Sequence, residues 1–137
     1  MDKRTLAREL AMQALYQLDV QGQQVMDTLP LFFRQNTDDD MVFKLAQQWS
    51  MGTWEHIDVC NDLIETAAVK WQMARMSNVD RCILRLAAYQ LKYCQDIPGK
   101  VVINEAIEMA KKYSAQQSPR FVNGVLDAIL KKLAEKS

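Results

Sequence analysis

The stretch SPRFVNGVLDAILKK, residues 118–132, decides the structure of the C-terminal part of the chain. Its Asn123-Gly124 pair would predict a β-hairpin if hydrophobic residues alternated on both sides. The apolar residues instead return at helical spacing: Phe121, Val122, Val125, Leu126, Ile129, Leu130 and Leu133. Ser118 and Pro119 suit a helix start, because a serine oxygen caps unpaired N–H groups and proline fits the first turn. We therefore predict one helix with Asn-Gly inside it.

A glycine inside a helix lowers its stability by ~1 kcal/mol relative to alanine, so Gly124 needs an explanation. Our hypothesis is that the missing side chain lets a neighbouring helix, such as the first in the chain, approach closely. Asn123 would then hydrogen-bond across that contact and hold Phe121 in place.

The same periodicity runs through the rest of the chain, and no segment alternates as a strand would. We expect Gly22 to end the first helix, a break at Gly52 with Thr53, and a capping box formed by Ser77 and Asp80. The expected helices cover residues 6–18, 27–35, 41–49, 57–71, 79–91, 103–112 and 118–133. The fold class is therefore all-α, a compact bundle of about seven helices.

Length and composition indicate one globular domain over residues 1–137, with 49% hydrophobic residues. The N-terminus lacks the apolar core of a signal peptide and no run is long enough to cross a membrane, so we expect a cytoplasmic protein. Three cysteines without C-x-x-C spacing argue against disulfides and a zinc site. With only four glycines, there is no phosphate-binding loop and we expect no cofactor.

The charges sum to zero but are unevenly distributed. Residues 20–80 hold nine acidic and four basic residues, whereas residues 81–137 hold five acidic and ten basic ones. This asymmetry is compatible with a polyanionic partner, although a mixed solvated surface explains it equally well.

Catalytic motifs are absent, so we do not expect an enzyme. His56 is the only histidine, and its neighbours Glu55 and Asp58 do not supply the three or four ligands of a metal site. We interpret His56 as a surface or helix-capping residue. No serine lies in a nucleophile elbow and no cysteine has a catalytic motif around it.

Two basic segments are better candidates for a binding site. Lys3, Arg4 and Arg8 lie at the start of the first helix, with the two arginines one turn apart. The segment KKYSAQQSPRF, residues 111–121, combines cations with two aromatic residues and two glutamines. Cations bind phosphates and aromatic rings stack on unpaired bases, so these are the components of a single-stranded RNA site. The alternative is that Tyr113 and Phe121 belong to the core.

Three longer stretches together resemble the NusB family of bacterial transcription antitermination factors. They are ARELAMQALYQLD at 7–19, VDRCILRLAAYQLKY at 79–93 and IPGKVVINEAIEMAKKYSAQQSPRFVNGVLDAILKKL at 97–133. The resemblance spans nearly the whole chain and is weakest over residues 20–55. It implies an all-helical fold of two packed sub-bundles.

The resemblance also implies a function. Family members bind the boxA element of ribosomal RNA transcripts together with NusE, a small-subunit ribosomal protein, and act with other Nus factors on the elongating RNA polymerase. Some relatives self-associate, so homodimerisation stays open. The implied RNA-binding residues are Lys3, Arg4, Arg8, Tyr113, Gln117, Arg120 and Phe121. The implied NusE-binding residues are Tyr16, Arg75 and Asp80.

Two features depart from the family pattern. The N-terminus MDKRTLARE has fewer cations than the arginine cluster common in the family and contains Asp2, so electrostatic affinity for RNA should be weaker. Gln117 stands where some relatives carry a carboxylate, and a neutral side chain should repel phosphate less.

Two other functions remain alternatives at this point. One is a helical module that binds only proteins. The other is a detached accessory domain of a ribosomal-RNA cytosine methyltransferase, because the N-terminal region of some of these enzymes resembles the same fold.

Overall fold

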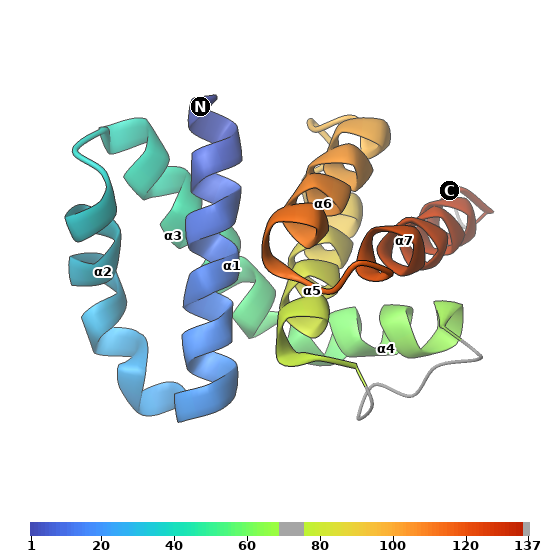
Figure 1. Ribbon diagram of the computed structural model, residues 1–137, viewed down its shortest axis with the longest axis horizontal. Coiled ribbons are helices and arrows are strands. Elements are labelled where there is room, and N and C mark those ends of the chain that lie inside the picture. The colour runs from blue at the N-terminus through green and yellow to red at the C-terminus, as the bar shows by residue number, and fades with distance from the viewer. Residues whose placement is uncertain (69–75, 136–137) are drawn as a thin grey trace.

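A computed structural model describes residues 1–68 and 76–135, and within these ranges it contains helices and no strand. This confirms the expected all-α fold, which Figure 1 shows. The helices are α1 (Lys3–Gln21), η1 (Gln23–Thr28), α2 (Leu29–Asn36), α3 (Asp40–Glu55), α4 (Ile57–Ala67), α5 (Asn78–Tyr93), α6 (Gly99–Tyr113) and α7 (Ser118–Glu135). None of them is long and apolar enough to span a membrane.

The helices form two packed groups, as the family resemblance implied. Helices α1, α2 and α3 lie together on one side, and α4 to α7 lie on the other (Figure 1). Helix α1 packs against both α3 and α5 and therefore joins the two groups. A continuous core runs across the junction, with Leu15, Leu18, Ile83, Leu86 and Leu126 all fully buried.

The helix ends follow the local chemistry of the sequence. The carboxylate of Asp2 accepts hydrogen bonds from the N–H groups of Arg4 (2.8 Å) and Thr5 (3.3 Å), so this acidic residue caps α1. Gly22 ends the helix as expected, in the left-handed conformation with φ 89°. Ser77 caps α5 by accepting from the N–H of Asp80 at 3.1 Å.

The expected break at Gly52 and Thr53 is wrong. Helix α3 continues through both residues to Glu55, and His56 forms the junction with α4. Gly52 is required by packing, because a Cβ there would lie 2.1 Å from the hydroxyl oxygen of Tyr89. The glycine thus marks a close contact between α3 and α5 and not a helix end. Trp71, the expected last apolar residue of the next helix, lies outside the described residues.

The structure also overturns the hypothesis for Asn123 and Gly124. Both lie inside α7 as predicted, but both are exposed to solvent. Apart from its two chain neighbours and the backbone of its own helix, no described residue has an atom within 4 Å of a Cβ built on Gly124. No helix therefore approaches Gly124 closely, and its presence is not explained by packing within the described chain.

Candidate functional site

The N-terminal cations do not all reach the surface. Lys3 and Arg4 are exposed at the start of α1, and the Lys3 ammonium lies 2.8 Å from the carboxylate of Asp39. That ion pair links the beginnings of α1 and α3, and the hydrogen bond from Lys3 holds the pKa of Asp39 below its ordinary value. A nucleic acid bound here would compete with Asp39 for Lys3.

Arg8 differs from the expectation of an exposed cation, because only 2% of the residue is accessible. Its guanidinium lies 3.0 Å from a carboxylate oxygen of Glu105 on α6, and Nε donates to the Gln90 side chain at 3.4 Å. The guanidinium also lies 4.9 Å from the ring centre of Trp49 on α3. Arg8 therefore ties together both groups of helices and is not presented to a ligand.

Helix α1 and helix α6 meet along a polar seam centred on Glu9. The hydroxyl of Tyr113 donates to Glu9 at 2.5 Å, the ammonium of Lys112 lies 2.9 Å away, and Gln13 donates to the Tyr113 oxygen at 3.3 Å. Burial and the bond to Glu9 raise the pKa of Tyr113 above its ordinary value. Lys112 thus pairs with Glu9 across the two helices, while Lys111 pairs with Glu108 within α6 at 3.2 Å.

We call this the α1–α6 seam. A hollow of about 410 Å³ opens along it, lined by the charged side chains of Glu9, Glu105, Lys111 and Lys112 among others. Lys3 and Arg4 do not line this hollow: Lys3 pairs with Asp39 of α3, and Arg4 borders a second hollow of about 580 Å³ that shares Arg8 and Glu105 with the first. Lys3 and Gln13, the α1 residue that bonds to Tyr113, are about 15 Å apart along α1, since ten residues of helix rise by 1.5 Å each.

The turn between α6 and α7 brings together the remaining residues expected to bind RNA. Gln117 and Arg120 are exposed and Phe121 is half-buried, packed against the edge of the core. Gln117 immediately precedes α7, and its carbonyl oxygen accepts from the N–H of Phe121 at 3.4 Å. Both border a hollow of about 270 Å³ whose opposite wall includes Met76, Ser77 and Asp80 of the α5 start.

Two of the three residues expected to bind the protein partner are described, and their surroundings differ. Tyr16 lies on α1 with 39% of its surface exposed, which fits an interface residue. Arg75 lies outside the described residues. Asp80 is only 9% exposed, and its carboxylate accepts from the hydroxyls of Ser114 (2.5 Å) and Ser118 (3.0 Å). Asp80 therefore faces the α6–α7 turn, not the surface beside Tyr16.

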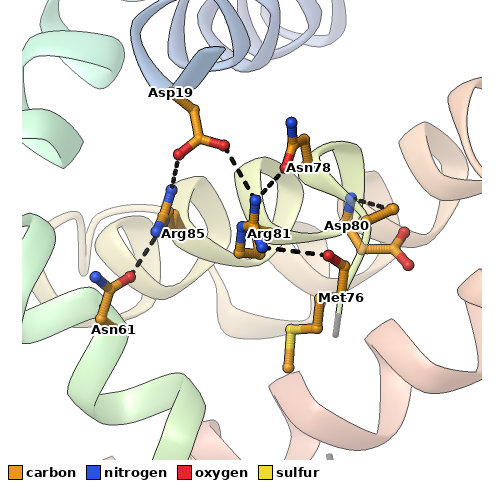
Figure 2. Close-up of polar contacts among 8 residues, drawn as sticks. Asp19, Asn61, Met76, Asn78, Asp80, Arg81 and Arg85 are labelled. Carbon is orange, nitrogen blue, oxygen red and sulfur yellow. Dashed lines mark hydrogen bonds and ion pairs between the residues drawn. The ribbon is translucent and has the colours of Figure 1, made fainter. Parts of the chain in front are cut away.

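An ion-pair network that was not predicted from the sequence joins the end of α1 to α5. Asp19 lies 3.0 Å from Arg85 and 3.4 Å from Arg81, and Arg85 Nε donates to the Asn61 side chain of α4 at 2.8 Å. Figure 2 shows both arginines pointing at Asp19, while the carboxylate of Asp80 points the other way. The spacing of Arg81 and Arg85, four residues apart on one helix, was the available signal.

Within residues 1–68 and 76–135, no three His, Cys, Asp or Glu side chains gather as metal ligands would. His56 Nδ1 lies 2.9 Å from the carbonyl oxygen of Gly52, and the ring packs against Tyr93 with centres 4.3 Å apart. Its role at the junction of α3 and α4 agrees with the expected capping interpretation.

Fold and site together define a helical binding domain with the polar α1–α6 seam and the exposed Tyr16. Comparison with known proteins gives its family. The family model described as NusB matches residues 5–131, and the chain belongs to the NusB family.

Curated relatives cover almost the whole chain. The Bacillus subtilis transcription antitermination protein NusB is 42% identical over 93% of this chain and 94% of its own length. The Desulfitobacterium hafniense protein of the same name is 38% identical over 97% and 91%.

Solved structures agree with the fold. NusB of T. maritima has a TM-score of 0.81 at 36% identity, covering 96% of this chain and 92% of its own. A crystal structure of the antitermination factors NusB and NusE in complex with dsRNA contains a chain with a TM-score of 0.84 at 26% identity, covering 96% and 98%.

Proposed function

We propose that this protein is a transcription antitermination factor that binds boxA-type single-stranded RNA together with NusE. In this role it assists RNA polymerase, with other Nus factors, in the processive transcription of ribosomal RNA operons. The observation that carries the proposal is the family match over residues 5–131, made with relatives named as transcription antitermination proteins. A neighbour solved with NusE and dsRNA supports NusE as the protein partner and RNA as the class of ligand. Those relatives do not favour a methyltransferase domain or a module that binds only proteins.

Family membership also supports three narrower parts of the proposal. The chain acts as a single RNA-binding domain over residues 1–137. It is not an enzyme, and it works in the cytoplasm, where transcription takes place in bacteria.

In this proposal, the RNA runs from the start of α1 across the α1–α6 seam to the α6–α7 turn. Lys3 and Arg4 bind phosphates at one end, and Tyr113, Gln117, Arg120 and Phe121 bind the strand at the other. The exposure of Lys3, Arg4, Gln117 and Arg120 supports these roles. The half-buried ring of Phe121 offers one edge for stacking an unpaired base. Arg8 is left out of this set because its guanidinium is buried and paired.

Among the residues proposed to contact NusE, Tyr16 has the strongest support, because 39% of its surface is exposed. Val20, one turn further along α1, is also exposed and extends the apolar surface. Aromatic and aliphatic side chains of this kind are typical anchors of protein interfaces.

Fluorescence anisotropy with a labelled boxA-like strand tests the function. A scrambled strand and a duplex of the same sequence serve as controls, each titrated with the protein alone and then with NusE. The proposal predicts selective binding of the boxA-like single strand that tightens with NusE, and reciprocal tightening of the protein pair by RNA. Equal affinity for all three RNAs in both conditions would contradict it.

A further inference from the structure

The carboxylate of Asp80 bridges the two ends of the α6–α7 turn. Ser114 immediately follows α6 and Ser118 begins α7. Their hydroxyls donate to different oxygens of the same carboxylate, Ser114 to Oδ1 at 2.5 Å and Ser118 to Oδ2 at 3.0 Å. Asp80 belongs to α5, so this bridge attaches the turn to a different helix.

Counting hydrogens shows that the bridge depends on Asp80. The two serine oxygens are also 3.0 Å apart, which gives three close contacts among three side chains. The serines have only two hydroxyl hydrogens between them, and an ionised carboxylate has none. Both hydrogens are used when both serines donate to Asp80, because bonds to a charged acceptor are the stronger ones. The serines alone could close only the third contact.

The turn held by this bridge carries residues of the proposed RNA site. The N–H of Ser118 donates to the carbonyl oxygen of Ala115 at 3.0 Å, which closes the turn around Gln117. The N–H of Phe121 donates to the carbonyl oxygen of Gln117 at 3.4 Å. Asp80, Gln117 and Phe121 also border the same hollow. A shift of the turn would therefore move both Gln117 and Phe121.

We infer that Asp80 is a positioning residue of the RNA site, and not a contact for the protein partner. This inference rests on the proposed RNA-binding function. The carboxylate fixes the α6–α7 turn against α5, so that Gln117 and Phe121 are already in place when the strand arrives. Preformed sites bind more tightly because the ordering of the loop does not have to accompany binding.

The substitution Asp80→Asn distinguishes the positioning of the α6–α7 turn from an effect of the negative charge at residue 80. Its Oδ1 can accept from Ser114, its Nδ2 can donate to Ser118, and Ser118 can then donate to Ser114 across the existing 3.0 Å contact. This closed ring keeps the turn attached without the negative charge. Asp80→Asn should therefore bind RNA within about twofold of wild type, since no hydrogen bond is lost.

Asp80→Ala removes the bridge. Its affinity for the boxA-like strand should fall about tenfold, the weaker end of what one stacked base contributes. Ser114→Ala combined with Ser118→Ala should give a similar loss with Asp80 intact, and it carries the test if Asp80→Ala does not fold. Circular dichroism and urea denaturation verify that each variant is folded under the binding conditions.

The binding of NusE by the same variants decides between the two roles. The inference predicts that Asp80→Asn, Asp80→Ala and the double serine variant keep wild-type affinity for NusE in the absence of RNA. Equal loss of RNA affinity by Asp80→Asn and Asp80→Ala would overturn it, as would a loss of NusE affinity with RNA binding intact. A double serine variant with wild-type RNA affinity would also overturn it. Failure of the wild-type protein to select boxA would instead overturn the proposed function, and this inference with it.

Discussion

At the scale of single residues, two helical glycines have opposite surroundings, and the same substitution should affect them in opposite ways. Gly124 is exposed, and beyond its two neighbours and its own helix backbone no described residue has an atom within 4 Å of a Cβ built on it. Gly124→Ala should raise the free energy of unfolding by ~1 kcal/mol, because alanine is the better helix former. Gly52→Ala should lower it by about 1–3 kcal/mol, because the methyl group would overlap Tyr89.

Urea denaturation of both variants provides the measurement. A destabilised Gly124→Ala would mean that another part of the chain contacts α7 at this position. A neutral Gly52→Ala would mean that Tyr89 moves aside easily.

Arg8 should affect stability more than RNA binding, because its guanidinium is buried against Glu105 and Trp49. We expect Arg8→Ala to lower the free energy of unfolding by about 3 kcal/mol, since it leaves part-buried groups without their partner. Lys3→Ala, an exposed substitution nearby, should change stability by no more than ~0.5 kcal/mol and serves as the control. Equal, small effects in thermal or urea denaturation would show that the Arg8 pair contributes little.

At the scale of elements, Asp39 at the start of α3 competes with RNA for Lys3 at the start of α1. Asp39 caps α3 by accepting from the N–H of Val42 at 3.1 Å, and it also binds Lys3 at 2.8 Å. Asp39→Asn keeps a good capping residue and removes the charge that holds Lys3. RNA affinity at low salt should rise about twofold, because one cation becomes available to phosphate. Anisotropy titrations would contradict this competition if the affinity stayed the same or fell.

The elements also show how far the sequence predicts this protein. Apolar periodicity located the seven α-helices of the described residues, and Gly22 correctly predicted the end of α1, whereas the expected start at Leu6 missed Asp2 as the N-cap. The continuation of α3 through Gly52 could not be predicted, because the reason is a contact with Tyr89, which is distant in sequence. Local patterns do not report which distant side chain a glycine accommodates.

The sequence indicated which types of residue the candidate site contains, but it gave the role of only some of them. Lys3, Arg4, Gln117 and Arg120 are exposed, as RNA contacts must be. The burial of Arg8 and Asp80 depends on Glu105, Ser114 and Ser118, and these pairings across helices leave no local signal in the sequence.

At the scale of the whole molecule, the buried thiols should make stability depend on pH in the alkaline range. Burial raises the pKa of Cys60 and of Cys82 from 9.0 to about 12. The unfolded chain loses these protons near pH 9 while the folded protein keeps them, so unfolding becomes more favourable as pH rises from 9 toward 12. Each thiol contributes a slope of up to roughly 1 kcal/mol per pH unit.

Urea denaturation between pH 8 and 11 measures this dependence, and a Cys60→Ala/Cys82→Ala variant is the control. The variant should show a shallower decline than wild type. Identical slopes would mean that the thiols titrate alike in the folded and unfolded states.

In the proposed complex, one RNA strand runs from Lys3 and Arg4, which bind its phosphates at the start of α1, across the α1–α6 seam to Phe121, on which a base stacks. The most direct test is the salt dependence of boxA binding in a Lys3→Ala/Arg4→Ala variant and in Phe121→Ala. Losing two phosphate contacts should flatten the slope of log K against log salt by about 1.4, given about 0.7 per phosphate for a single strand. Phe121→Ala should weaken binding by ~1–3 kcal/mol and leave the slope unchanged. An unchanged slope in the double variant, or a flattened one in Phe121→Ala, would contradict this division of roles.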